Sequence, residues 1–146
     1  MNFFLAICLL TLASNIDENA GVTPPPVQWL NLDQALSKAK TVNKPLFIYF
    51  SAEWCVYCKK MERRVFSEKD VQNYLNGQFI PVRIDGESEN NLKGIKSPIT
   101  SREFRKQFDI SAYPTFIILS PEGAVLTKWT GYSSKSELLG TYRLIR

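Results

Sequence analysis

The 146-residue sequence contains no histidine. Without this residue the chain has no Ser-His-Asp triad, no Cys-His nucleophile pair, and no zinc or haem site with a histidine ligand. The sequence also lacks a glycine-rich phosphate-binding loop, so nothing in it indicates a nicotinamide or flavin site. We therefore expect that the protein needs no cofactor and no metal ion.

Neither sign of charge dominates the chain. Lysine and arginine number 18 and the acidic residues 14, which leaves a net charge of +4. A surplus this small and dispersed does not predict a nucleic-acid partner. Hydrophobic residues make up 45% of the chain and charged residues 22%, which is typical of an ordered protein. At this length we expect one domain of ordinary size.

One apolar run stands near the N-terminus, at residues 3–13. Eleven helical residues cross only about half of a hydrocarbon layer of about 30 Å, so we expect no membrane span. The length is typical of the apolar region of a secretory signal, although no lysine or arginine precedes it. A buried N-terminal helix or an interfacial anchor is the alternative. We predict a signal peptide at residues 1–20 and a protein that is periplasmic or otherwise exported.

Three consecutive prolines, Pro24–Pro26, follow this segment and favour an extended conformation. We therefore predict a proline-rich tether at residues 21–28 and a single domain at residues 29–146. Removal of the first segment would remove Cys8 and leave Cys55 and Cys58 as the remaining cysteines. Two cysteines three positions apart do not make a structural disulfide framework.

The rest of the chain alternates between strand-like and helix-like patterns. Apolar runs bounded by turn residues predict strands at 46–50, 79–85, 115–119 and 125–130. Capping residues predict helices after Asn31, Ser67 with Asp70, Thr100 with Glu103, and Ser134 with Glu137, the second of which should end at Asn76-Gly77. A further helix should follow the cysteine motif. With the two consecutive helical pieces counted together, the order is α-β-α-β-α-β-β-α. It predicts an α/β fold with a mixed sheet sandwiched by helices, and a polar loop at 86–98.

The two cysteines lie where the first strand gives way to a helix, in Trp54-Cys55-Val56-Tyr57-Cys58. At a helix N-terminus the unpaired N–H groups and the helix dipole favour the thiolate of Cys55. The thiolate is the nucleophile of disulfide exchange. Cys58 lies one turn further along and is more sheltered by the helix. Cys55 should therefore attack a substrate disulfide, and Cys58 should resolve the mixed disulfide.

Other interpretations of these residues remain open. Two chains could share a metal ion, although a lone C-x-x-C motif supplies only two of the usual four ligands. The pair could also form a purely structural disulfide. Trp54 could pack in the core or form an aromatic rim beside the reactive sulfur. The nearby basic residues could form a solvated face, lower a thiolate pKa or meet an acidic partner: Lys59, Lys60, Arg63 and Arg64.

The segment Ser51–Lys60, the later Tyr113-Pro114-Thr115 and Gly131 together resemble the thioredoxin family. Within it, Cys55-Val56-Tyr57-Cys58 and the run from Val65 to Val71 are most similar to the C-terminal domain of the periplasmic thiol:disulfide interchange reductase, of Dsb type. The resemblance covers about residues 29–139. It implies a thioredoxin fold and a redox-active Cys55–Cys58 disulfide.

The resemblance also implies a substrate-binding surface. Pro114 should follow a cis peptide bond and face the two sulfurs. The backbone of Tyr113 should pair with an extended substrate segment, as an added strand does. Trp54 and Gly131 should belong to the same surface.

The sequence departs from the family pattern in two places. The family usually has a buried acid six residues before the first cysteine, which helps to deprotonate the resolving thiol. Here that position is Tyr49, whose ordinary pKa of about 10 makes it a poor base. The residues between the cysteines are Val56-Tyr57 rather than Gly-Pro, so the reduction potential of thioredoxin cannot be assigned to this cysteine pair.

Together these features predict an exported, monomeric thiol:disulfide oxidoreductase that reduces protein disulfides. Its partners should be protein thiols and disulfides and a membrane electron donor, because no electron-carrying cofactor is predicted. Two alternatives remain. The same residues could serve an oxidase or isomerase, or the domain could be a partner-binding module in cytochrome or redox-protein maturation.

Overall fold

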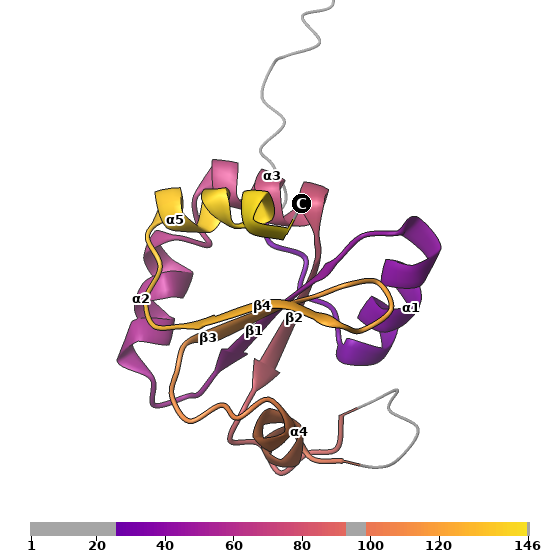
Figure 1. The fold of residues 1–146 in the computed structure, drawn as a ribbon. Helices are drawn as coiled ribbons and strands as arrows, with labels where there is room; N and C mark the ends of the chain where they lie inside the picture. Colours follow the sequence, from indigo (N-terminus) through magenta and orange to yellow (C-terminus); the bar gives the residue numbers. More distant parts are fainter. Residues whose placement is uncertain (1–25, 93–98, 146) are drawn as a thin grey trace, which may run out of the picture.

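The computed structural model describes residues 26–92 and 99–145. Its elements follow the predicted order (Figure 1): α1 (Leu32–Val42), β1 (Leu46–Ser51), α2 (Val56–Arg64), α3 (Lys69–Gln78), β2 (Ile80–Asp85), α4 (Ser101–Gln107), β3 (Thr115–Leu119), β4 (Val125–Thr130), α5 (Lys135–Gly140) and a 3₁₀ helix η1 (Thr141–Ile145). The predicted signal peptide at 1–20, Cys8, and residues 93–98 of the polar loop lie outside the described residues.

The four strands form one mixed sheet in the order β2-β1-β3-β4. β1 runs parallel to β2 and antiparallel to β3, and β3 runs antiparallel to β4. All residues of β1 and β3 are buried, as expected for continuous apolar runs covered on both faces. The prediction of an α/β thioredoxin fold with a mixed sheet is confirmed.

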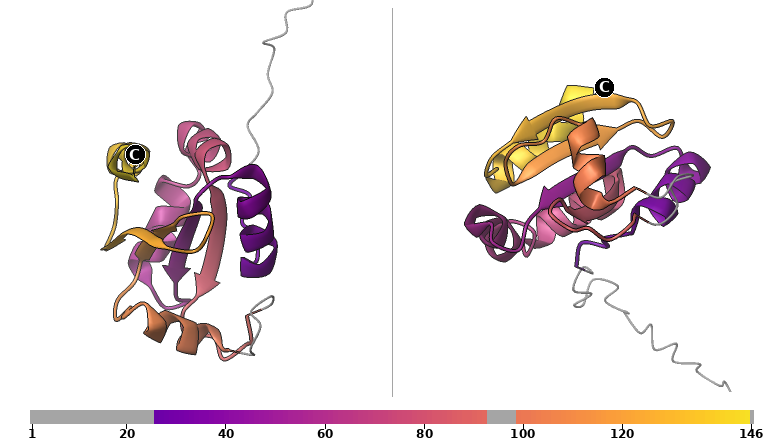
Figure 2. Two further views of the ribbon diagram at one scale, coloured as in Figure 1. Left: turned by 45° about the vertical axis from the view of Figure 1, so that its right-hand side comes forward. Right: turned by 90° about the horizontal axis from the view of Figure 1, so that it is seen from below.

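Helices cover both faces of this sheet, and side chains alternate between them along each central strand. Phe47 and Tyr49 of β1 point into a cluster with α2, α3 and α5, whereas Leu46, Ile48 and Phe50 point into a second cluster with α1 and α4. Figure 2 shows α1 on the opposite side of the sheet from α3 and α5. The start of α2, which follows β1, therefore packs against the first of these two clusters.

Side-chain capping sets the helix starts in four places. Asn31 caps α1, and the predicted capping boxes at Thr100 with Glu103 and at Ser134 with Glu137 are both present. Cys55 itself caps α2 through its sulfur. The predicted box at Ser67 with Asp70 is wrong, because the Ser67 hydroxyl donates to the carbonyl of Arg63 instead and α3 begins after Glu68.

The end of α3 also differs from the prediction. Asn76-Gly77 does not stop the helix, which continues to Gln78 with Phe79 as its C-cap. The side chain of Asn76 accepts a hydrogen bond from the Gln28 backbone at 2.9 Å and donates one to the Pro26 carbonyl at 3.1 Å. Val27 is buried in the same core. Packing of the domain thus begins inside the segment for which a tether was predicted.

Candidate redox site

The local structure places Cys55 at the N-cap of α2, directly after the buried strand β1. Its Sγ accepts a hydrogen bond from the Cys58 backbone N–H at 3.1 Å. One of the unpaired N–H groups at the helix start is thereby directed at this sulfur. The same N–H group, together with the helix dipole, stabilises negative charge on the Cys55 sulfur when the disulfide is reduced.

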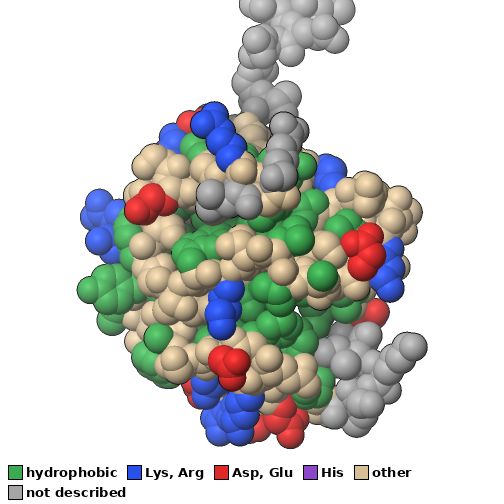
Figure 3. All heavy atoms as spheres, viewed as in Figure 1, with side chains coloured by type: hydrophobic (Ala, Val, Ile, Leu, Met, Phe, Trp, Pro, Cys, Tyr) green, Lys and Arg blue, Asp and Glu red, His purple; other side chains and the backbone are tan. Residues whose placement is uncertain are grey.

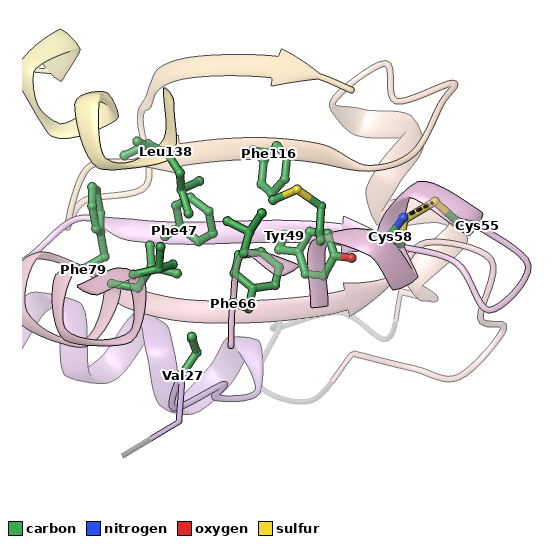
Figure 4. Close-up of a cluster of buried hydrophobic side chains, with 14 of the residues drawn as sticks. Val27, Phe47, Tyr49, Cys55, Cys58, Phe66, Phe79, Phe116 and Leu138 are labelled. Atoms are coloured by element: carbon green, nitrogen blue, oxygen red, sulfur yellow. Dashed lines mark hydrogen bonds between the residues drawn. A yellow bond between two sulfur atoms is a disulfide. The ribbon is translucent and has the colours of Figure 1, made fainter. Parts of the chain in front are cut away.

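Cys55 and Cys58 form a disulfide in the structure, with their Cα atoms 5.2 Å apart. Only 3% of Cys55 and 1% of Cys58 is exposed to solvent. Both belong to the core cluster that also contains Tyr49, Phe66 and other apolar side chains (Figure 4). Across residues 26–92 and 99–145, no group of three or more histidine, cysteine or acidic residues is arranged to hold a metal ion.

Three side chains around the buried sulfurs are exposed: Trp54 (67%), Val56 (72%) and Tyr57 (60%). Figure 3 shows hydrophobic side chains protruding at the left, beside α2. Of the two interpretations of Trp54, the structure therefore supports an aromatic rim rather than core packing. The Trp54 ring meets the Tyr113 ring edge to face, with the centroids 5.7 Å apart.

The sheet brings Tyr113 and Pro114 to the same end as the cysteines. Phe50 near the end of β1 pairs with Thr115 at the start of β3, so the segments beyond these residues lie next to each other. The Tyr113–Pro114 peptide bond is cis, and Pro114 is buried. Among the described residues, none hydrogen-bonds to the backbone N–H or carbonyl of Tyr113. These groups are free to pair with an incoming extended segment.

Gly131 supports the cis-proline segment from the other side. Its backbone N–H donates to the Pro114 carbonyl at 2.8 Å, and its φ of +106° is one that glycine adopts readily. The adjacent Thr115 hydroxyl donates to the Ala112 carbonyl at 2.7 Å and lies 2.8 Å from the Thr130 hydroxyl. Gly131 therefore braces Pro114 through the backbone.

The basic residues of α2 are exposed, which fits the interpretation as a solvated face. One of them has a specific contact: the Lys60 ammonium lies 4.6 Å from the centre of the Tyr132 ring. A cation over an aromatic face is worth about 0.5–1 kcal/mol at an exposed site. This contact ties α2 to the loop after β4.

Tyr49 occupies the position of the missing acid and cannot serve as a base. It is fully buried, its ring stacks on Phe116, and its hydroxyl has no hydrogen-bond partner among the described residues. Burial raises the pKa of Tyr49 well above its ordinary value, and the negative charge of Glu62 raises it further, while Arg83 lowers it. Glu62 pairs with Arg83 at 2.7 Å. Glu53 is exposed.

Sequence reasoning missed the partner of Tyr113. The Tyr113 hydroxyl donates to a carboxylate oxygen of Glu87 at 2.9 Å. Glu87 lies 26 residues earlier, in the loop that follows β2, and no local sequence pattern links the two. The glutamate in turn lies within ion-pair distance of Arg102 and Arg105 of α4.

Comparisons with known proteins agree with this geometry. A family model described as a thioredoxin-like domain matches residues 32–145. The thiol:disulfide interchange protein DsbD of Campylobacter jejuni is 32% identical over 110 residues, which cover 75% of this chain and 18% of DsbD. The chain thus spans less than a fifth of the length of the curated relatives it matches.

Solved structures show the same fold. A DsbH oxidoreductase superposes with a TM-score of 0.69 at 17% identity, covering 90% of this chain and 92% of that one. A thioredoxin h from poplar gives a TM-score of 0.60 at 26% identity, covering 83% of this chain and 96% of that one. Within the described ranges, no helix is both long and apolar enough to cross a membrane. The family match, the fold and the Cys-x-x-Cys disulfide together show that this chain belongs to the thioredoxin-like family, as a Dsb-type member with the cysteine pair of a thiol:disulfide oxidoreductase.

Proposed function

We propose that this domain reduces disulfide bonds in exported proteins. The observation that carries the proposal is the Cys55–Cys58 pair at the start of α2, with a backbone N–H directed at the sulfur of Cys55. In the reduced state, the Cys55 thiolate attacks one sulfur of a substrate disulfide. A bond forms between Cys55 and the substrate, and the other substrate sulfur leaves as a thiolate that takes a proton from water.

The second half of the reaction regenerates the disulfide seen in the structure. Cys58 gives up its proton and attacks the sulfur of Cys55, which releases the second substrate thiolate. Two electrons have then passed from the protein to the substrate. Because Tyr49 stays protonated, the proton of Cys58 passes to water rather than to a buried carboxylate.

The surface beside the disulfide suits an extended polypeptide. Trp54 supplies an exposed aromatic face, and the backbone of Tyr113 has unpaired hydrogen-bonding groups next to cis-Pro114. A substrate segment that pairs there as an added strand would place its own disulfide near Cys55. We assign substrate binding to Trp54, Tyr113, Pro114 and Gly131, the last through its hydrogen bond to Pro114.

The reduction potential of the Cys55–Cys58 couple tests the direction of electron flow. We expect a value of about −270 mV or lower, as in thioredoxin, when the protein is equilibrated with dithiothreitol or glutathione. A value near about −120 mV would instead make the protein an oxidant. That outcome would support the alternative of an oxidase or isomerase and remove the need for an electron donor.

A reductant of this kind needs an electron donor in the compartment in which it acts. We propose that the donor is a membrane protein with its own dithiol. We also propose that this domain is exported after cleavage of the predicted signal peptide and acts as a monomer. Mass spectrometry of the secreted or periplasmic fraction should find a mature N-terminus between Ser14 and Gly21. An intact Met1 in the cytosolic fraction would contradict export.

A further inference from the structure

The ring of Tyr113 is held from several sides by residues from other parts of the chain. Its hydroxyl donates to Glu87, the Trp54 ring packs against it edge to face, and the Arg105 guanidinium lies 5.9 Å from its centre. Gly86 lies so close that a Cβ there would be 2.7 Å from the Cε1 atom of Tyr113. Only glycine leaves room for the ring in this position.

Glu87 is the point at which these contacts join. Its two carboxylate oxygens lie 3.5 Å from Arg105 and 3.6 Å from Arg102, and its carbonyl accepts from Arg102 at 3.2 Å. Arg105 also donates to the Ile110 carbonyl at 2.6 Å, in the segment that leads to Tyr113. The network therefore links the loop after β2, helix α4 and the residues before the cis peptide bond.

Partial burial strengthens this network. The side chains of Arg105 and Glu87 are 19% and 31% exposed, so their charges are less screened than those of a surface pair. Arg102 is more exposed, and it makes its shortest ion pair with Glu89, at 2.7 Å. Figure 3 shows basic and acidic side chains gathered over α4.

Resting on the proposed function, we propose that Glu87 is a positioning residue for substrate binding. By fixing the Tyr113 ring, it holds the adjoining peptide groups in the extended geometry that an added strand requires, and it holds the Trp54 rim beside them. Ordering these groups in advance lowers the entropic cost of binding an extended segment. The beginning of the polar loop at 86–98 thus forms part of the site.

The proposal is tested by single-turnover oxidation of the prereduced full chain by two substrates. One is a cysteine-containing octapeptide joined to a second copy by a disulfide, and the other is bis(2-hydroxyethyl) disulfide, which has no peptide groups to pair. For Glu87→Ala we expect the half-saturating concentration of the peptide to rise about tenfold, which corresponds to loss of one hydrogen bond to a charged group. The ratio of the second-order rate constant for the peptide to that for bis(2-hydroxyethyl) disulfide should fall by the same factor.

Glu89→Ala is the matched control. Glu89 is in the same loop and pairs with the same Arg102, but the Tyr113 hydroxyl donates to Glu87 and not to Glu89, whose side chain is 64% exposed. This variant should keep the wild-type ratio. Glu87→Gln retains an oxygen that can accept from the Tyr113 hydroxyl and should recover most of the peptide affinity.

Two further variants guard against a simple loss of folding. Gly86→Ala displaces the Tyr113 ring without changing any charge, and Tyr113→Phe removes the hydroxyl alone; both should lower the ratio. Combining Tyr113→Phe with Glu87→Ala should add little, because both remove one interaction. Equal ratios in the Glu87→Ala and Glu89→Ala variants would overturn the proposal. If the wild-type protein reduced neither substrate, the proposed function would fail instead.

Discussion

Replacement of Cys55 by serine is expected to abolish reduction of insulin disulfides, and replacement of Cys58 is expected to stop the reaction half way. Without the Cys55 sulfur no bond to the substrate can form, so turnover should fall to the uncatalysed rate. Without Cys58 the first step still occurs, since the Cys55 sulfur at the start of α2 is unchanged. The substrate should then remain attached through a mixed disulfide.

The trapped species is measured by non-reducing electrophoresis and by the mass of the adduct. The double variant Cys55→Ser with Cys58→Ser serves as the control and should form no adduct. Full turnover by Cys58→Ser would rule out the two-cysteine mechanism. The same trap separates a reductase from a partner-binding module, because a reductase should capture several proteins and a dedicated module mainly one.

Stability is expected to fall as the pH rises above about 10, and Tyr49→Phe should remove part of this fall. Burial raises the pKa of Tyr49 in the folded chain, whereas the unfolded chain keeps the ordinary value of about 10. Above that value the unfolded state loses a proton that the folded state retains. The unfolded state therefore binds fewer protons, and the free energy of unfolding decreases by about 1.4 kcal/mol per pH unit for each such proton.

Urea unfolding at pH 7 and pH 11 measures this effect. At pH 7 both states carry the Tyr49 proton, so the loss of stability linked to this proton is absent there. Removing an unpartnered buried hydroxyl should then raise the free energy of unfolding by about 1 kcal/mol. Tyr57→Phe, at an exposed position, is the control and should leave the alkaline decline as in the wild type. An identical decline in Tyr49→Phe would contradict this account.

Local patterns predicted most of the elements because the deciding interactions are local. The capping boxes at Thr100 and Ser134 each use a side chain and a backbone group three residues apart. The box expected at Ser67 failed since that hydroxyl had a competing acceptor at the end of α2. The preceding helix thus decided where α3 begins, and no pattern within α3 records this.

The candidate site likewise has one part that the sequence predicts and one part that depends on the three-dimensional fold. The position of Cys55 at a helix start follows from the strand and the C-x-x-C spacing, both visible in the sequence. The exposure of Trp54 and the anchoring of Tyr113 by Glu87 depend on which segments the sheet brings together. An ion-pair network assembled from a loop, a helix and a cis-proline segment has no sequence period, so it could be found only in three dimensions.

Folding and the redox state of the Cys55–Cys58 pair form one thermodynamic cycle, and both cysteines lie in the same buried cluster as Phe47, Phe66 and Leu138. The difference in unfolding free energy between the disulfide and dithiol forms must equal the difference in the free energy of oxidation between the folded and unfolded chain. A core change that weakens one form by about 1.4 kcal/mol more than the other shifts the potential by about 30 mV. Packing around Leu138 in α5 can thereby bias the direction of electron flow without any contact with a substrate.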